Sequence, residues 1–201
     1  KRNDMGKIYC LLGKSSSGKD TLFKMLLEES GLALKTIVPY TTRPIRVGEQ
    51  EGVEYHFVTE ETQKKLEAEG KIIELRAYDT ICGVWKYFTV DDGQIDLATD
   101  NYLVIGTLES YVKMRDYFGA EKIVPLYVEV EDGERLLRAL TRERAQKEPN
   151  YAELFRRFLA DSVDFSAERL KAAGICRWFE NTEKNVTCKE LVSYIKADIE
   201  Q

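Results

Sequence analysis

The chain has 201 residues, of which 43% are hydrophobic and 32% are charged, proportions typical of a globular protein that can bury one large core. Its formal net charge of −5 disfavours general binding to nucleic acid, and no apolar run approaches the length of a membrane span. The single histidine, His56, argues against a Ser-His catalytic pair and against a histidine-rich metal site. We expect one domain over residues 1–201.

The cysteines and the N-terminus carry no sign of a secreted or metal-binding protein. Cys10, Cys82, Cys176 and Cys188 lack the paired spacing of metal ligands, and no signal-peptide pattern opens the sequence. We expect reduced thiols and a cytoplasmic protein. The residues ahead of Met5, 1–4, are assigned no function.

The segment from Gly13 to Thr21 reads Gly-Lys-Ser-Ser-Ser-Gly-Lys-Asp-Thr. An apolar run of strand length, 7–12, precedes it, and apolar residues at helical spacing follow it as far as Gly31. A glycine-rich turn between a strand and a helix presents backbone N–H groups to an anion, and the helix dipole adds to the attraction. The segment predicts a phosphate-binding loop, with Lys19 as the cation that spans the β- and γ-phosphates.

A second stretch, 41–58, is also rich in groups that bind anions. Arg43 and Arg46 follow an apolar, β-prone run over 34–40, and arginine forks match phosphate oxygens bidentately. Residues 52–58 alternate as a strand would, which places Tyr55 and Phe57 on one face. Taken alone, these residues are better explained as a solvated surface pair and as core packing.

Together with the phosphate loop, this stretch resembles guanylate kinase. The matching residues are Thr41-Thr42-Arg43, Arg46-x-Gly48-Glu49 and Gly52-x-x-Tyr55-x-Phe57. The correspondence runs from about residue 7 to the C-terminus. The strand–helix alternation and the resemblance imply a P-loop kinase fold, an α/β protein whose parallel sheet is flanked by helices. The core would comprise about 5–36, 93–141 and 158–201. Two segments would be inserted in it: a β-rich monophosphate-binding segment near 37–92 and a helical lid near 142–157.

The resemblance assigns the guanine site to the strand predicted over 71–75 and to the residues after it. Glu74 lies among apolar neighbours and needs a partner; the family's matching glutamate accepts from guanine N1–H and the 2-amino group. Thr89 would present its hydroxyl to guanine O6. Phe88 stands where the family has glycine. The alternative for Glu74 is an acid at a strand edge that faces water. The residues expected to bind GMP are Arg43, Arg46, Tyr55, Glu74, Tyr87 and Thr89.

The chain departs from the family after the strand predicted over 101–106. Guanylate kinases usually carry Asp-x-Asp-x-x-Gly there, and this chain has Val104-Ile105-Gly106-Thr107-Leu108-Glu109. Both acids are missing, and a support for catalysis is lost with them. Glu109 and Asp20 are the candidates to compensate. Asp20 is otherwise explained as an acid that favours the dipole of the helix after the loop.

Two arginine-bearing helices are expected in the last third of the chain. Asp132 is predicted to cap the first, the polar hinge spans 146–150, and the second begins at Tyr151. By spacing, Arg142 and Arg157 match lid arginines that embrace the transferred phosphoryl group. The alternative is a hairpin with salt-bridged faces. A strand over 176–179 and a helix over 189–199 follow, and the resemblance implies that Asn181 touches the adenine of ATP.

The implied activity is transfer of the γ-phosphoryl group of ATP to GMP, with Mg²⁺ held partly by Thr21. Catalytic roles fall to Lys19, Arg142 and Arg157. The residues expected to bind ATP are Gly13, Ser15, Ser16, Ser17, Gly18, Lys19, Asp20, Thr21 and Asn181. One alternative is a related kinase with another phosphorylated acceptor, such as ribose 1,5-bisphosphate, whose kinases have a similar Gly-Lys-Asp-Thr ending. Another is a non-catalytic guanylate-kinase-like binding module. Small-molecule nucleotides are the expected partners, without nucleic acid or membrane; the oligomeric state is left open.

Overall fold

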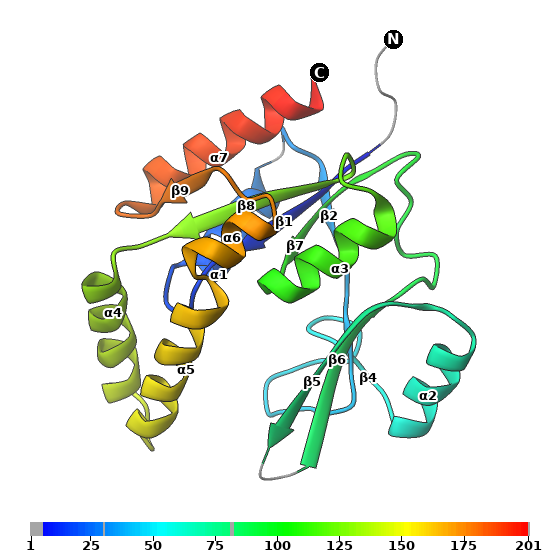
Figure 1. The fold of residues 1–201 in the computed structure, drawn as a ribbon, viewed down its shortest axis with the longest axis horizontal. Helices are drawn as coiled ribbons and strands as arrows, with labels where there is room; N and C mark the ends of the chain where they lie inside the picture. Colours follow the sequence, from blue (N-terminus) through cyan, green and yellow to red (C-terminus); the bar gives the residue numbers. More distant parts are fainter. Residues whose placement is uncertain (1–5, 30, 81–82, 201) are drawn as a thin grey trace.

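The computed structural model describes residues 6–29, 31–80 and 83–200, so Cys82 and the residues before Gly6 lie outside the described part. Its centre is a five-stranded sheet in the order β2-β7-β1-β8-β9, and every neighbouring pair in it is parallel (Figure 1). The strands are β1 (Ile8–Leu12), β2 (Leu34–Thr36), β7 (Asn101–Ile105), β8 (Ile123–Glu129) and β9 (Trp178–Glu180). The expected fold class, a parallel sheet flanked by helices, is confirmed.

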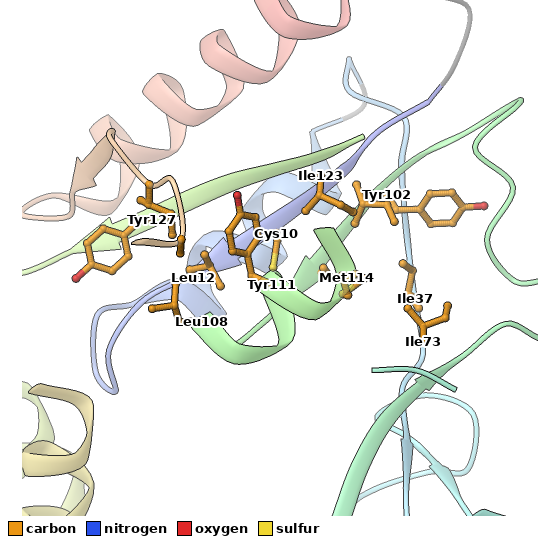
Figure 2. Packing of buried hydrophobic residues seen from close by; sticks show 14 of the residues in the cluster. Cys10, Leu12, Ile37, Ile73, Tyr102, Leu108, Tyr111, Met114, Ile123 and Tyr127 are labelled. Carbon is orange, nitrogen blue, oxygen red and sulfur yellow. The ribbon is translucent and has the colours of Figure 1, made fainter. Parts of the chain in front are cut away.

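The central strand β1 is buried on both faces, as its apolar run predicts. Ile8, Cys10 and Leu12 pack on one side in a cluster with α3 (Leu108–Phe118) and α6 (Ala167–Ala172) (Figure 2). Tyr9 and Leu11 pack on the other side with α1 (Lys19–Glu28) and α7 (Lys184–Ile199). Helices therefore cover both faces, and the loops that follow the strands gather at the carboxyl edge of the sheet, where ligands bind in folds of this kind.

A second, four-stranded sheet lies below that edge, in the order β4-β3-β6-β5 (Figure 1). It comprises β3 (Tyr40–Thr41), β4 (His56–Phe57), β5 (Ile72–Thr80) and β6 (Gly83–Val90), with α2 (Glu60–Ala68) beside it. Ile37 and Ile73 meet where the chain passes between the two sheets (Figure 2). The β-prone run over 34–40 is divided between two strands, because the chain leaves one sheet at Thr36 and joins the other at Tyr40. Between them Val38 donates to the Gln94 side chain, and Pro39 has no N–H for a ladder.

The two arginine-bearing helices are α4 (Asp132–Arg144) and α5 (Tyr151–Asp164), which form a hairpin on the opposite side from the second sheet (Figure 1). The predicted cap at Asp132 is wrong by one residue, because Glu131 accepts from the backbone N–H groups of Gly133 and Glu134. Helix α7 begins at Lys184, earlier than expected, since Glu183 caps it in the same way. The short helix α6 was not predicted. None of the described helices has the length and apolar character needed to cross a membrane.

Candidate active site

The glycine-rich loop joins the end of β1 to the start of α1. Ser16 and Gly18 both have positive φ, 63° and 85°. A Cβ at Gly18 would collide with the side-chain amide nitrogen of Asn181, and one at Gly13 would lie 2.7 Å from the carbonyl oxygen of Val128. Both glycines are therefore required by close packing, and the strained φ of Ser16 lies in the loop that the sequence predicts to bind phosphate.

Asn181 lies beneath this loop and supports it. Its Nδ2 donates to the Ser17 carbonyl oxygen at 2.8 Å, and its backbone N–H bonds to Glu129. Asn181 and Ser17 are both buried, and neither Asn181 Oδ1 nor Ser17 Oγ has a partner among the described residues. The residue thus holds the shape of the loop, and its contact with adenine stays a prediction.

A cavity of about 580 Å³ connects the loop with the second sheet. The loop contributes Gly13, Ser15, Lys19 and Asp20 to its wall, and Thr21 is exposed on α1 away from it. The second sheet and its connection contribute Tyr55, Glu74, Arg76, Tyr87 and Thr89. Residues predicted to bind ATP and residues predicted to bind GMP, far apart in the sequence, therefore line the same cavity, and Arg76 lines it with them.

The antiparallel pair β5 and β6 provides the wall that carries Glu74. The register pairs Glu74 with Thr89 and Arg76 with Tyr87, so these four side chains lie on one face. Glu74 is 3% exposed; its Oε1 accepts from Thr89 Oγ1 at 2.9 Å, and its Oε2 accepts from Arg76 Nε at 3.0 Å. The buried carboxylate thus already has partners within the protein, and the alternative of an acid facing water is wrong.

Arg76 is a site residue that the sequence analysis missed. The signal was present, because Arg76 follows Glu74 by two positions in a strand and must share its face. Burial alone would lower the pKa of Arg76, but the adjacent Glu74 outweighs burial and holds that pKa above its ordinary value. Cys10 is buried nearby, and burial raises the pKa of its thiol to about 12, so this cysteine stays protonated.

The two arginines expected at the acceptor phosphate do not line the cavity. Arg43 is buried behind Tyr55, 5.1 Å from its ring centre, and donates to both carboxylate oxygens of Glu49, at 2.8 and 2.6 Å. The hydrogen bond from Arg43 lowers the pKa of Glu49 to about 2. Arg46 is exposed, with its guanidinium 5.9 Å from the Trp85 ring centre. Tyr55 and Tyr87 stand between Arg43 and the cavity.

No carboxylate follows β7 at the cavity wall in the described structure, where residues 104–107 contribute only apolar, glycine and hydroxyl groups. Glu109 does not compensate, because it pairs with Lys113 at 2.6 Å outside this cavity. Besides Glu74, three other acids line the cavity: Asp20 from the loop, Glu54 from the connection before β4, and Asp161 from α5. The sequence analysis assigned Asp161 no role in a binding site.

Asp161 ties the helical hairpin to the phosphate loop. Its Oδ2 accepts from the backbone N–H of Ser15 at 2.8 Å and from Arg135 Nη1 at 3.2 Å. Arg135 is 1% exposed, lies 4.0 Å from the ring centre of Phe158, and also pairs with Asp132 at 3.0 Å. One amide of the loop is therefore occupied by a carboxylate from the hairpin.

The predicted lid arginines lie beside the loop on the hairpin side. Arg142 and Arg157 line a narrow hollow together with Ser15 and Ser16, and Arg142 Nη2 donates to Ser16 Oγ at 3.3 Å. Arg157 pairs with Glu153 at 3.2 Å, and both side chains are largely exposed. Ser15 lines this hollow and the large cavity, so the arginines reach the loop from the side opposite the acceptor residues.

Comparisons with known proteins agree with this geometry. A sequence model described as guanylate kinase matches residues 5–82. The guanylate kinase of Chlorobaculum tepidum is 31% identical over 171 residues, which cover 84% of this chain and 75% of that protein. The chain belongs to the guanylate kinase family. In the guanylate kinase of Schizosaccharomyces pombe, identity is 48% over 68 residues, 34% of each protein.

The similarity to the family is uneven along the chain. The matched stretches span about a third of the Schizosaccharomyces pombe protein and of the guanylate kinase of Sphingopyxis alaskensis, 34% and 32%. The crystal structure of guanylate kinase from Anaplasma phagocytophilum aligns with a TM-score of 0.69 at 20% identity, and covers 99% of this chain and 89% of that one. The fold of the guanylate kinase family is thus kept throughout, including the part after residue 82.

Proposed function

We propose that this protein transfers the γ-phosphoryl group of ATP to GMP, giving ADP and GDP. The observation that carries the proposal is the single cavity in which Lys19 and the loop lie opposite Glu74, Tyr55 and Tyr87. Phosphoryl transfer needs little covalent participation from a protein. It needs two polyanions held in line and neutralisation of the charge on the transferred group.

Each group of residues has a place in that reaction. The loop N–H groups and Lys19 would hold the phosphates of ATP, and Arg142 with Arg157 would neutralise the moving group. Tyr55 and Tyr87 would donate to the acceptor phosphate, and the positive charges of Arg43 and Arg46 would add to the attraction. Glu74 would bind the guanine, and Thr89, whose hydroxyl donates to Glu74, would hold that carboxylate in place. Closing the hairpin over the loop would exclude water, whose attack on ATP is the competing reaction.

The residues present fit a magnesium ion that enters with ATP. Mg²⁺ is bound in such sites by one or two carboxylates, by water and by the phosphates of the substrate. Asp20 lines the cavity and Thr21 does not, which makes the Asp20 carboxylate the better placed ligand of the two. The ion, when bound, would supply positive charge to the phosphate oxygens.

A phosphoryl-transfer assay with a panel of acceptors tests the proposal. We expect ADP formation with ATP, Mg²⁺ and GMP, and much lower rates with AMP, CMP, UMP and ribose 1,5-bisphosphate. Lys19→Ala should abolish turnover with GMP, because the cation between the β- and γ-phosphates is lost. A preference for ribose 1,5-bisphosphate would favour the kinase with another acceptor. Failure to bind ATP with Mg²⁺ by calorimetry would favour the non-catalytic binding module.

A further inference from the structure

A cation lies next to the carboxylate that is expected to bind guanine. The Arg76 side chain is 16% exposed, lines the cavity, and approaches Glu74 through Nε at 3.0 Å and Nη2 at 3.3 Å. A guanidinium has five N–H donors, and these two bonds use two of them. Nη1 has no hydrogen-bond acceptor among the described residues. A ligand that reaches this end of the cavity therefore meets unused donors on a largely buried cation, and acceptor atoms on the ligand would satisfy them.

The hydroxyl of Thr89 is not available as a donor to the same ligand. Its one hydrogen is directed to Glu74 Oε1, at 2.9 Å. That oxygen also accepts from Arg76 Nη2, whereas Oε2 accepts only from Arg76 Nε. A base that brings two donors to Glu74 must therefore displace Arg76 from part of the carboxylate.

We propose that Arg76 is a specificity-determining residue that reads the O6 and N7 edge of the acceptor base. This inference rests on the proposed function. As GMP enters, Glu74 exchanges Arg76 for guanine N1–H and the 2-amino group, and Arg76 turns its free donors to O6 and N7. An arginine fork matches these two guanine acceptors bidentately. Adenine presents an amino group where guanine has O6, so it would face the donors of Arg76 with donors of its own.

The pairing in the unliganded protein has a second consequence. Without Arg76, Glu74 would be a buried carboxylate supported only by Thr89, which is costly. Arg76 therefore keeps the guanine site charged and satisfied until the base arrives. The reading of O6, which the resemblance gave to Thr89, passes to Arg76 in this arrangement.

The test compares GMP with 7-deaza-GMP, in which N7 is replaced by a C–H group, in the wild type and in Arg76→Ala. We expect the wild type to prefer GMP by about tenfold in kcat/KM, since one polar contact is lost with N7. In Arg76→Ala the preference should fall to about onefold, and Arg76→Lys, which lacks the fork, should lie between. Each ratio compares two substrates on one preparation, so it does not depend on how much of a variant is folded.

Lys71→Ala is the matched control. Lys71 lies just ahead of the same strand, is half exposed and pairs with Glu69, so its removal takes away a cation without touching the cavity. It should keep the wild-type ratio. If Arg76→Ala has no turnover, the ratio of dissociation constants for the two ligands gives the same comparison. Equal ratios in an active wild type and in Arg76→Ala would overturn the inference and leave the proposed function intact. A wild type that does not phosphorylate GMP would overturn both.

Discussion

Two glutamates near the acceptor end of the cavity are each held by an arginine. Arg43 donates to both oxygens of Glu49, and Arg76 to both oxygens of Glu74. Removing one partner of such a pair leaves the other charge without compensation, which costs about 3–5 kcal/mol in a fully buried pair. The exposed pair of Arg169 and Asp164 lacks that consequence, since solvent replaces the lost partner. At this end of the cavity, the negative charge of each glutamate is therefore compensated by the arginine that bonds to it.

The Arg43–Glu49 pair makes stability depend on pH in a predictable direction. The hydrogen bond from Arg43 lowers the pKa of Glu49 to about 2, below its ordinary value of 4.5. Between these values the unfolded chain binds more protons than the folded one, so the contribution of the pair is present above pH 4.5 and is lost as the pH falls towards 2. We expect Glu49→Gln to flatten this part of the profile, as measured by urea unfolding at a series of pH values.

The control for the Glu49 prediction is a glutamate whose pKa is lowered by something other than an arginine. Glu183 caps α7 through the backbone N–H groups of Asn185 and Val186, which lower its pKa without an arginine. Glu183→Gln should therefore reduce stability by weakening the cap, and the effect of Glu49→Gln on the profile should be unchanged in that background. Parallel profiles for the wild type and Glu49→Gln between pH 5 and 2 would contradict the assignment.

At the scale of elements, the sequence was informative where local rules decide the structure. The apolar run before the loop forms strand β1, and the helix expected after the loop is α1, which begins at Lys19. The division of 34–40 between two sheets could not be read from the sequence, because it depends on Gln94, which bonds to Val38 from across the chain. Asp161 could be placed one helical turn after Arg157, but its bond to Ser15 is a tertiary contact that no local pattern contains.

The tie between the helical hairpin and the loop leads to a prediction about stability. Arg135 is 1% exposed and bonds to Asp161, to Asp132 and to the Ser15 carbonyl oxygen. We expect Arg135→Ala to lower the free energy of unfolding by about 3 kcal/mol, because Asp161 loses its charged partner and the Phe158 ring loses its cation. Urea unfolding of the variant measures this loss.

The control is another arginine of the hairpin whose pair is exposed. Arg156 bonds to Glu153 on the surface of α5, and its side chain is 65% exposed. Arg156→Ala should change the free energy of unfolding by less than about 1 kcal/mol, since exposed pairs contribute little. Equal losses in the two variants would mean that the hairpin is not held through Arg135.

At the scale of the whole molecule, the parallel sheet places the loop, the end of β7 and Asn181 at one edge, and the second sheet stands below that edge. The meeting of the two predicted binding sites in one cavity follows from this topology and from no single motif. The missing acids after β7 leave that part of the wall without a carboxylate, and the acids of the cavity come instead from other elements: Asp20, Glu54, Glu74 and Asp161. Many of the residues that line the cavity could be named from the sequence, whereas the pairs that hold them in place could not.

A shared cavity predicts that one molecule can occupy both sites. Adenosine and guanosine joined through their phosphate chains should bind much more tightly than ATP or GMP alone, because the second contact becomes intramolecular once the first is made. Calorimetry with the linked compound, ATP and GMP measures this gain. Lys19→Ala and Glu74→Ala should each remove most of this gain in affinity, since each removes the protein contacts to one end of the linked compound and leaves the contacts to the other end in place. In Glu74→Ala the affinity for ATP should be kept, which separates loss of the guanine contact from unfolding. An affinity for the linked compound no better than that for ATP would mean that the loop and the acceptor residues do not act on one pair of substrates, whatever their distance in the folded chain.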